Sequence, residues 1–282
     1  MANALPTVYI NGTYTSKEDA RISPFDRGFL FADAVYEVIP VFSSKILMLE
    51  KHLLRLGNSL QQLRIPNLYT TDEWIEIINT LITKNGGGDV AVYIQVSRGA
   101  EDGRDHFYPE DIQPTVFAMV TSIVPSPKDT AGISVITLED NRWARCDIKS
   151  SSLLANIMVR QQARDSGVDD AILIRDGVLT EAGSASVITV ENGVVIARPN
   201  GNQLLPGTTR AMVIDLAKSD GIECRQEIIP ESRLCNSDEI WLLSATKGIV
   251  PVIKLNGNAI GDGKPGKLWR RVHELYEADK RS

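Results

Sequence analysis

A proline-rich segment near the middle of the chain is the feature that most constrains the fold. Residues 122–134 include Pro125 and Pro127, and this composition is typical of a linker between two folded parts. The chain has 282 residues, which is enough for one large domain or two modest ones. We therefore expect a small N-terminal α/β domain over residues 1–121, an interdomain linker over 122–134 and a large C-terminal domain over 135–282.

Helix-like and strand-like patterns are mixed on both sides of this linker. Leucines at positions 53, 56, 60 and 63 are spaced by 3, 4 and 3 residues, which predicts a helix over about 49–64. A β-rich run at 35–41 precedes that helix. After the linker, residues 208–219 predict another helix, and Ser150 with the two serines that follow it can cap a third. The mixture predicts an α+β fold class.

Composition and charge narrow the class of protein. The formal net charge is −6 and no basic block is concentrated anywhere, so we expect no nucleic-acid partner. No apolar run approaches a membrane span, and the N-terminus lacks the basic and apolar regions of a signal peptide. Three widely spaced cysteines, Cys146, Cys224 and Cys235, favour a reducing compartment. We therefore expect a cytoplasmic protein without a membrane partner.

Lys149 lies where a predicted extended segment meets a predicted helix. Apolar neighbours can desolvate a lysine, which lowers its pKa and frees the amine as a nucleophile. Schiff-base chemistry needs such an amine. A lysine at a helix start is more often a surface residue, so its position alone leaves both interpretations open.

Two further segments have the chemistry of a cofactor site. Gly207, Thr208 and Thr209 open a predicted helix, and the N–H groups and dipole of a helix N-terminus suit a phosphate group. Threonine is also a common helix cap. Glu181 is followed by small residues, and a carboxylate beside a pyridine nitrogen would keep that nitrogen protonated. An acidic loop residue is the commoner alternative for Glu181.

A polar loop contains Arg104 and, two residues later, His106. In an extended segment both side chains would point the same way. The pair could then hold a carboxylate, with the planar fork of the arginine giving the geometry. A solvated loop is the alternative. Arg55 lies off the leucine face of its predicted helix, and spacing alone favours a solvated arginine there.

Together, and in this order, these segments resemble the fold-type IV family of pyridoxal-phosphate enzymes. The family includes D-amino acid transaminases, branched-chain aminotransferases, (R)-selective amine transaminases and aminodeoxychorismate lyases. The resemblance covers the chain almost from end to end. Its matching blocks are residues 25–28, 35–37, 50–56, 145–150, 179–184, 205–210 and 244–246.

The resemblance implies a two-domain fold with its active site between the domains and pyridoxal 5'-phosphate as cofactor. Lys149 would bind the cofactor as a Schiff base and move the proton at the substrate α-carbon. Glu181 would pair with the pyridine nitrogen, and Leu205 would pack on the ring. The residues implied around the phosphate are Arg55, Gly207, Thr208, Thr209, Ser244, Ala245 and Thr246. At Ala245 the D-amino acid branch has threonine, so only a backbone N–H is available there.

Within the family, the blocks most resemble the D-amino acid transaminase branch. The resemblance implies that Tyr36, Arg104 and His106 hold the substrate carboxylate. It also implies a homodimer in which the partner subunit contributes the loop with Arg104 and His106. The implied reaction is ping-pong transfer of an amino group from a D-amino acid such as D-alanine to a 2-oxo acid such as 2-oxoglutarate.

Two kinds of alternative stay open at this point. One keeps the fold and changes the chemistry, to a branched-chain L-amino acid transaminase, an (R)-amine transaminase or an aminodeoxychorismate lyase. The other is a non-catalytic carrier of pyridoxal phosphate. Lys149 argues against a carrier, because a carrier has no need of a proton shuttle.

Overall fold

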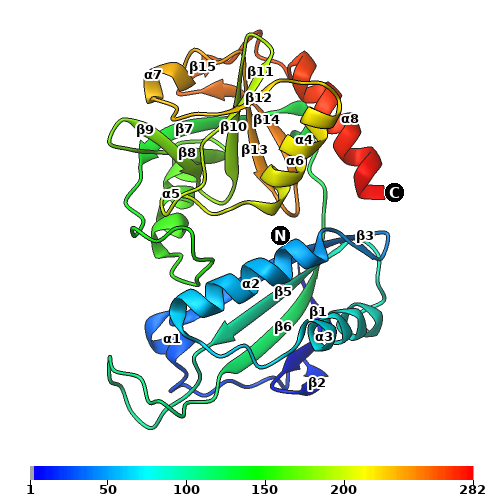
Figure 1. Ribbon diagram of the computed structural model, residues 1–282, viewed down its shortest axis with the longest axis vertical. Coiled ribbons are helices and arrows are strands. Elements are labelled where there is room, and N and C mark those ends of the chain that lie inside the picture. The colour runs from blue at the N-terminus through cyan, green and yellow to red at the C-terminus, as the bar shows by residue number, and fades with distance from the viewer. Residues whose placement is uncertain (1–2, 282) are drawn as a thin grey trace. The chain divides into compact units, whose positions relative to one another are not determined.

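The computed structural model describes residues 3–281 and divides the chain into two compact units. Unit 1 is Met1–Val124 together with Ile148–Ser152, and unit 2 is Pro125–Asp147 together with Leu153–Ser282. Figure 1 labels the elements of both units. The division after Val124 falls inside the segment expected to be a linker. Lys149, however, groups with unit 1, whereas we expected it in the C-terminal domain.

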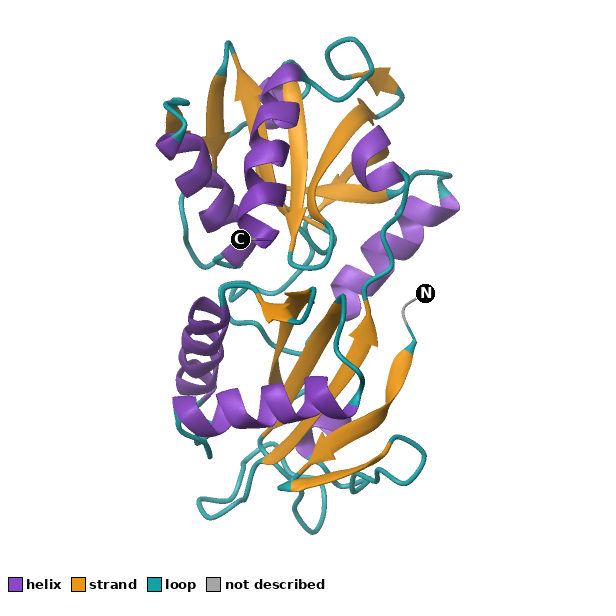
Figure 2. Cartoon of the chain, turned by 90° about the vertical axis from the view of Figure 1, so that its right-hand side faces the viewer, coloured by secondary structure: helices purple, strands orange, loops and turns teal. Residues whose placement is uncertain are grey.

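The sheet of unit 1 has six strands, all antiparallel, in the order β2-β1-β6-β5-β3-β4. Figure 2 shows its strands side by side. The strands are β1 (Ala4–Ile10), β2 (Thr13–Ser16), β3 (Ala34–Phe42), β4 (Lys45–Ile46), β5 (Val90–Ser97) and β6 (Thr115–Ser122). In β6 buried residues alternate with partly exposed ones, so one of its faces points into the core, whereas β3 and β5 are buried over most of their length.

Two long helices cover that buried face. The helices of unit 1 are α1 (Arg27–Phe31), α2 (Leu49–Leu63) and α3 (Thr71–Lys84). The leucine periodicity is confirmed, because Leu53, Leu56 and Leu60 of α2 all lie in the core with β3, β5 and β6. Trp74 begins the apolar face of α3 in the same core. Ile148 joins this core from outside the first 124 residues, which is why the Lys149 segment belongs to unit 1.

Unit 2 is built on a nine-stranded mixed sheet in the order β12-β11-β10-β13-β14-β7-β8-β9, with β15 paired to β14. The strands are β7 (Ile133–Glu139), β8 (Asp170–Arg175), β9 (Val178–Ala182), β10 (Ser186–Glu191), β11 (Val194–Ala197), β12 (Cys224–Gln226), β13 (Glu239–Ser244), β14 (Gly248–Leu255) and β15 (Asn258–Ala259). Side chains of β8 alternate between two clusters: Ile172 lies in the main core, while Ala171 and Leu173 pack with α5.

The helices of unit 2 are α4 (Lys128–Ala131), α5 (Leu154–Asp165), α6 (Thr208–Ser219), α7 (Glu231–Leu234) and α8 (Lys267–Arg281). The predicted helix over 208–219 is confirmed by α6. Together with the two sheets, these helices confirm the expected α+β class. Within residues 3–281, no helix is both long enough and apolar enough to cross a membrane.

The expected serine cap of α5 is wrong. The Ser151 N–H and hydroxyl both donate to the Ala34 carbonyl, and Ser150 forms a β-bridge with Val35. The serines therefore extend the edge of the unit 1 sheet, and α5 begins later without any side-chain cap. A cap needs a side chain directly before the first helical turn, and these serines are already used elsewhere.

Candidate active site

Lys149 is held against β3 by its backbone. Its carbonyl accepts a hydrogen bond from the Tyr36 N–H at 2.9 Å, and its own N–H donates to the Ser59 hydroxyl at 3.2 Å. Its ammonium lies 4.2 Å from the centroid of the Tyr36 ring. The structure thus brings together Lys149, the expected proton shuttle, and Tyr36, which we expect to bind the substrate carboxylate. The aromatic face favours a nearby cation.

The Tyr36 ring is itself supported by a residue that sequence reasoning missed. Tyr93 on β5 stacks on Tyr36 with 5.7 Å between ring centroids, and its hydroxyl donates to the Gln95 side chain at 2.6 Å. Burial raises the pKa of Tyr93 to about 12, and Tyr36 adds to this effect. The Tyr93 hydroxyl is therefore neutral at physiological pH and acts as a hydrogen-bond donor.

Arg55 is buried rather than solvated, so its expected exposure on the basis of spacing is wrong. It projects from α2 to the Glu37 carboxylate on β3, and its Nε and one terminal nitrogen donate at 2.6 and 2.9 Å. His52, one turn earlier, contacts the same carboxylate through Nδ1 at 2.8 Å. Burial alone would raise the pKa of Glu37, but Arg55 and His52 lower it to about 2. The arginine therefore sits in a fixed orientation.

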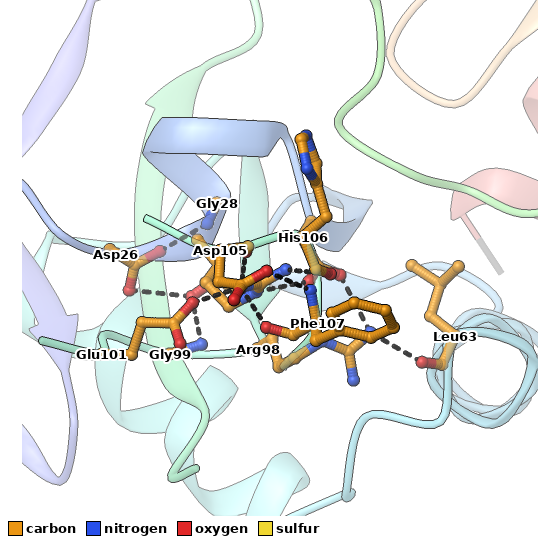
Figure 3. A network of polar contacts seen from close by, with 12 residues as sticks. Asp26, Gly28, Leu63, Arg98, Gly99, Glu101, Asp105, His106 and Phe107 are labelled. Atoms are coloured by element: carbon orange, nitrogen blue, oxygen red, sulfur yellow. Dashed lines mark hydrogen bonds and ion pairs between the residues drawn. The ribbon is translucent and has the colours of Figure 1, made fainter. Parts of the chain in front are cut away.

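The loop after β5 brings Arg104 and His106 onto one aromatic side chain. The Arg104 guanidinium lies 4.8 Å from the centroid of the Phe31 ring, and the His106 ring centroid lies 5.6 Å from it. We expected Arg104 and His106 to point the same way because they would lie in an extended segment, but neither residue lies in a strand. Both side chains instead contact the ring of Phe31, at the end of α1. Figure 3 shows the His106 ring projecting away from the neighbouring network of polar contacts.

In unit 2, Glu181 on β9 is bound by an arginine that the sequence did not single out. Arg142 donates to the Glu181 carboxylate at 2.5 Å and to the Asp140 carboxylate at 2.9 Å through two nitrogens. Burial alone would lower the pKa of Arg142, but the two carboxylates raise it. The Thr180 hydroxyl also donates to Asp140 at 2.7 Å. Glu181 is therefore an oriented carboxylate beside a permanent cation.

The N-terminus of α6 has the features of an anion site. Gly207 is its N-cap residue and provides no side chain, so the first N–H groups of the helix lack a side-chain cap. The Thr209 hydroxyl is buried and has no hydrogen-bond partner within residues 3–281. A Cβ at Gly207 would lie 2.5 Å from the Ser186 hydroxyl, so any other residue here would force that buried hydroxyl to move. A phosphate group matches this set of donors.

The other expected cofactor ligands of unit 2 lie at the same end of its sheet. Ser186 beside Gly207 pairs with Leu243, so Ser244 follows directly at the end of β13. Ala245 and Thr246 form the turn to β14, and all three are partly exposed. Leu205 is half-buried in the loop before α6. Unit 2 therefore gathers the helix N-terminus and the turn residues, while unit 1 gathers Lys149, Tyr36, Arg55 and the Arg104 loop.

Comparison with known families and sequences then identifies relatives over nearly the whole chain. The model of the amino-transferase class IV family matches residues 34–255. A D-alanine aminotransferase of Bacillus licheniformis is 34% identical over 271 residues, covering 96% of this chain and 95% of that protein. A D-alanine aminotransferase of Staphylococcus epidermidis is 32% identical, covering 96% of each chain.

Solved structures show the same fold. The Escherichia coli branched-chain amino acid aminotransferase superposes with a TM-score of 0.90 at 24% identity, covering 97% of this chain and 94% of that one. A hypothetical aminotransferase from Mycobacterium tuberculosis, solved in a PLP-bound form, gives a TM-score of 0.85 at 23% identity, covering 96% and 98%. At these identities the likeness concerns the fold alone.

Proposed function

The chain belongs to the class IV aminotransferases, and from this membership we propose that it transfers the amino group of a D-amino acid, such as D-alanine, to a 2-oxo acid, such as 2-oxoglutarate. The observation that carries the proposal is the similarity to D-alanine aminotransferases over 96% of the chain. The ammonium of Lys149 beside the Tyr36 ring supports it, because the reaction needs an amine close to a substrate-binding group.

The donors at the start of α6 fit pyridoxal 5'-phosphate as cofactor. The buried Thr209 hydroxyl has no partner within the described residues, and a phosphate oxygen would supply one. Arg55, Thr208 and Thr209 would hold the phosphate together with the turn at Ser244, Ala245 and Thr246. When bound, the cofactor supplies a ring that accepts electrons from the substrate α-carbon.

Each remaining site residue has one role in this proposal. Lys149 Nζ would hold the cofactor covalently; once a substrate amine has displaced it, the freed Lys149 amine would accept the proton from the substrate α-carbon and later give it up again. Glu181, oriented by Arg142, holds a proton on the pyridine nitrogen, because its carboxylate stabilises the adjacent positive charge. Leu205 packs against one face of the ring.

Substrate selection rests on the α-carboxylate. Tyr36 donates from its hydroxyl, and Arg104 and His106 add a planar cation and an imidazole. We propose a homodimer in which the Arg104 loop of one subunit serves the site of the other. The position of this clamp determines which enantiomer presents its α-hydrogen to Lys149. The unpaired cysteines are typical of a reducing compartment, so we place the enzyme in the cytoplasm.

The test is a half-reaction without an oxo-acid acceptor. The loaded enzyme is mixed separately with D-alanine, L-alanine, L-leucine and (R)-1-phenylethylamine, and the visible absorption and the released oxo product are followed. We expect a spectral change and one equivalent of pyruvate with D-alanine, and no change with L-alanine. A change with L-leucine or the amine alone would overturn the D-amino acid assignment and leave the family membership intact.

A further inference from the structure

Arg27, the first residue of α1, is a buried cation at the centre of a polar cluster. Its Nε donates to Asp33 at 3.1 Å, and one terminal nitrogen pairs with Glu101. Both carboxylates are largely buried, with side-chain exposures of 15% and 13%, while that of Arg27 is 4%. An arginine so enclosed has few alternative positions, because any movement would separate buried opposite charges.

The same guanidinium also binds the backbone of the Arg104 loop. It donates to the carbonyls of Asp105 and His106 at 2.7 and 3.2 Å, and to that of Phe107 at 3.4 Å. These three consecutive carbonyls follow Arg104 directly in sequence. The loop has no helix or strand at this point, so Arg27 supplies the hydrogen bonds that regular structure would otherwise provide. Figure 3 shows these loop residues gathered around the cluster.

The base of the loop is fixed separately. Arg98 donates to the Asp33 carboxylate at 2.7 and 3.0 Å and to the Leu63 carbonyl at the end of α2. Gly99, with φ of 112°, packs against the backbone of Gln113, where a Cβ would meet the carbonyl oxygen at 1.9 Å. Because the two ends are held by these contacts, Arg27 acts on the tip that carries Arg104 and His106.

Phe31 connects the cluster to the clamp side chains. Its ring centroid lies 4.7 Å from the Arg27 guanidinium and 4.8 Å from that of Arg104. Arg27 and Phe31 lie at opposite ends of α1, whose start is fixed by Asp26, the residue that caps the helix at the Gly28 N–H. One short helix therefore positions both the backbone of the loop and the clamp arginine.

We propose that Arg27 is the positioning residue of the carboxylate clamp: it holds the tip of the loop so that Arg104 and His106 present one fixed geometry to the substrate carboxylate. This inference rests on the proposed function, in which the clamp residues bind that carboxylate. Because Arg27 is only 3% exposed, it acts through the loop rather than directly on the substrate. Its planar fork, with several donors in one plane, is what joins two carboxylates to three carbonyls, and lysine lacks it.

The test compares Arg27→Lys with Arg271→Lys in the loaded, full-length enzyme. Arg271 makes a two-bond pair with Asp220 on the surface, so its variant is a matched loss of an arginine fork elsewhere. The first measurement is trypsin cleavage after Arg104, which is exposed in the single chain and which, in the proposed dimer, trypsin reaches when the loop tip leaves its place. We expect Arg27→Lys to speed this cleavage about tenfold, because the loop tip loses its anchors. Arg271→Lys should leave the cleavage rate unchanged.

The second measurement is the half-reaction with D-alanine and with D-alaninol, which lacks the carboxylate. In Arg27→Lys, we expect kcat/KM for D-alanine to fall about thirtyfold, mostly through KM, while that for D-alaninol changes less than about threefold. If Arg27 had a purely structural role, kcat/KM would fall equally for both donors. Unchanged cleavage after Arg104, or an equal loss for both donors, overturns the proposal.

A gentler variant keeps the test decisive if Arg27→Lys fails to fold. Glu101→Gln retains Arg27 and its carbonyl contacts but removes one carboxylate anchor. We expect Glu101→Gln to speed cleavage after Arg104 and to lower kcat/KM for D-alanine, both by less than Arg27→Lys does. If a folded Glu101→Gln variant shows neither change, the proposal is contradicted. If the wild-type enzyme does not use D-alanine at all, the proposed function fails, and the cleavage rates still decide whether Arg27 holds the loop.

Discussion

The Arg55 guanidinium donates two hydrogen bonds to the Glu37 carboxylate, at 2.6 and 2.9 Å, and Glu37 has no exposed surface. We expect Glu37→Gln to lower the free energy of unfolding at pH 7 by about 3–5 kcal/mol, because the buried arginine loses its counter-charge. Urea unfolding followed by circular dichroism measures this. Glu76→Gln, at an exposed position of α3, is the control and should change stability by less than about 0.5 kcal/mol.

The pH dependence of the same pair has a definite sign. The pKa of Glu37 is about 2 in the folded chain against an ordinary value of 4.5, so its carboxylate stabilises the fold above pH 4.5. This contribution, about 3 kcal/mol, is lost as the pH falls toward 2. The difference in stability between wild type and Glu37→Gln should therefore narrow over that range. A difference that stays constant would mean that Glu37 titrates normally.

The unpartnered hydroxyl of Thr209 predicts a variant that separates cofactor binding from folding. Without cofactor, Thr209→Val should cost less than about 1 kcal/mol, because it removes a buried group that lacks a hydrogen bond. With pyridoxal phosphate, the dissociation constant should rise at least about tenfold, because a bond to a charged phosphate oxygen is lost. Fluorescence titration of the cofactor-free protein measures the dissociation constants of both the cofactor and inorganic phosphate.

Thr189 provides a matched control for Thr209. Its hydroxyl is also buried without a partner within the described residues, but it lies within β10 rather than at a helix N-terminus. Thr189→Val should therefore leave cofactor affinity unchanged. If the wild type, Thr209→Val and Thr189→Val bind pyridoxal phosphate with equal affinity, Thr209 does not contact the phosphate.

The sequence predicted those elements whose pattern repeats along the chain. The α2 leucines recur every three or four residues over about three turns, so burial of one helix face follows from periodicity alone. The cap expected from Ser150 failed because a tertiary contact, the bridge to Val35, competes for the same segment. Local patterns contain no information about such distant partners.

The site divides in the same way. Lys149 and Glu181 stand in segments that resemble a family, so motif comparison found them. Arg142 and Arg27 were missed because each joins a nearby carboxylate to one far away in sequence: Glu181 lies 39 residues from Arg142, and Glu101 lies 74 residues from Arg27. A buried charge that must pair with another buried charge is the signal that could have found them, but burial is known only once the sheets are formed.

The carboxylates around Arg142 predict a coupled loss of stability. Arg142→Met should lower the free energy of unfolding by about 3–5 kcal/mol, because the buried carboxylates of Asp140 and Glu181 both lose this cation, while Arg175 still pairs with Asp140. Combining it with Glu181→Gln should recover about 1–2 kcal/mol, which a double-mutant cycle by urea unfolding measures. Arg233→Met, which breaks two more exposed ion pairs in the same unit, with Glu191 and Glu227, should cost only about 1 kcal/mol. Strict additivity of the first two substitutions would contradict the ion-pair interpretation.

The clamp predicts that Arg104 matters only for donors that have a carboxylate. In Arg104→Ala, kcat/KM for D-alanine should fall about a hundredfold, because charge-assisted bonds to a carboxylate contribute about 1.5–3 kcal/mol each. For (R)-1-phenylethylamine, any activity of the wild type should change less than about threefold, since no carboxylate is present to lose. Arg225→Ala, at an exposed surface position, controls for the loss of charge and should alter neither donor. If the amine loses as much activity as D-alanine, Arg104 supports the loop instead of binding substrate, and the carboxylate must be held by other residues.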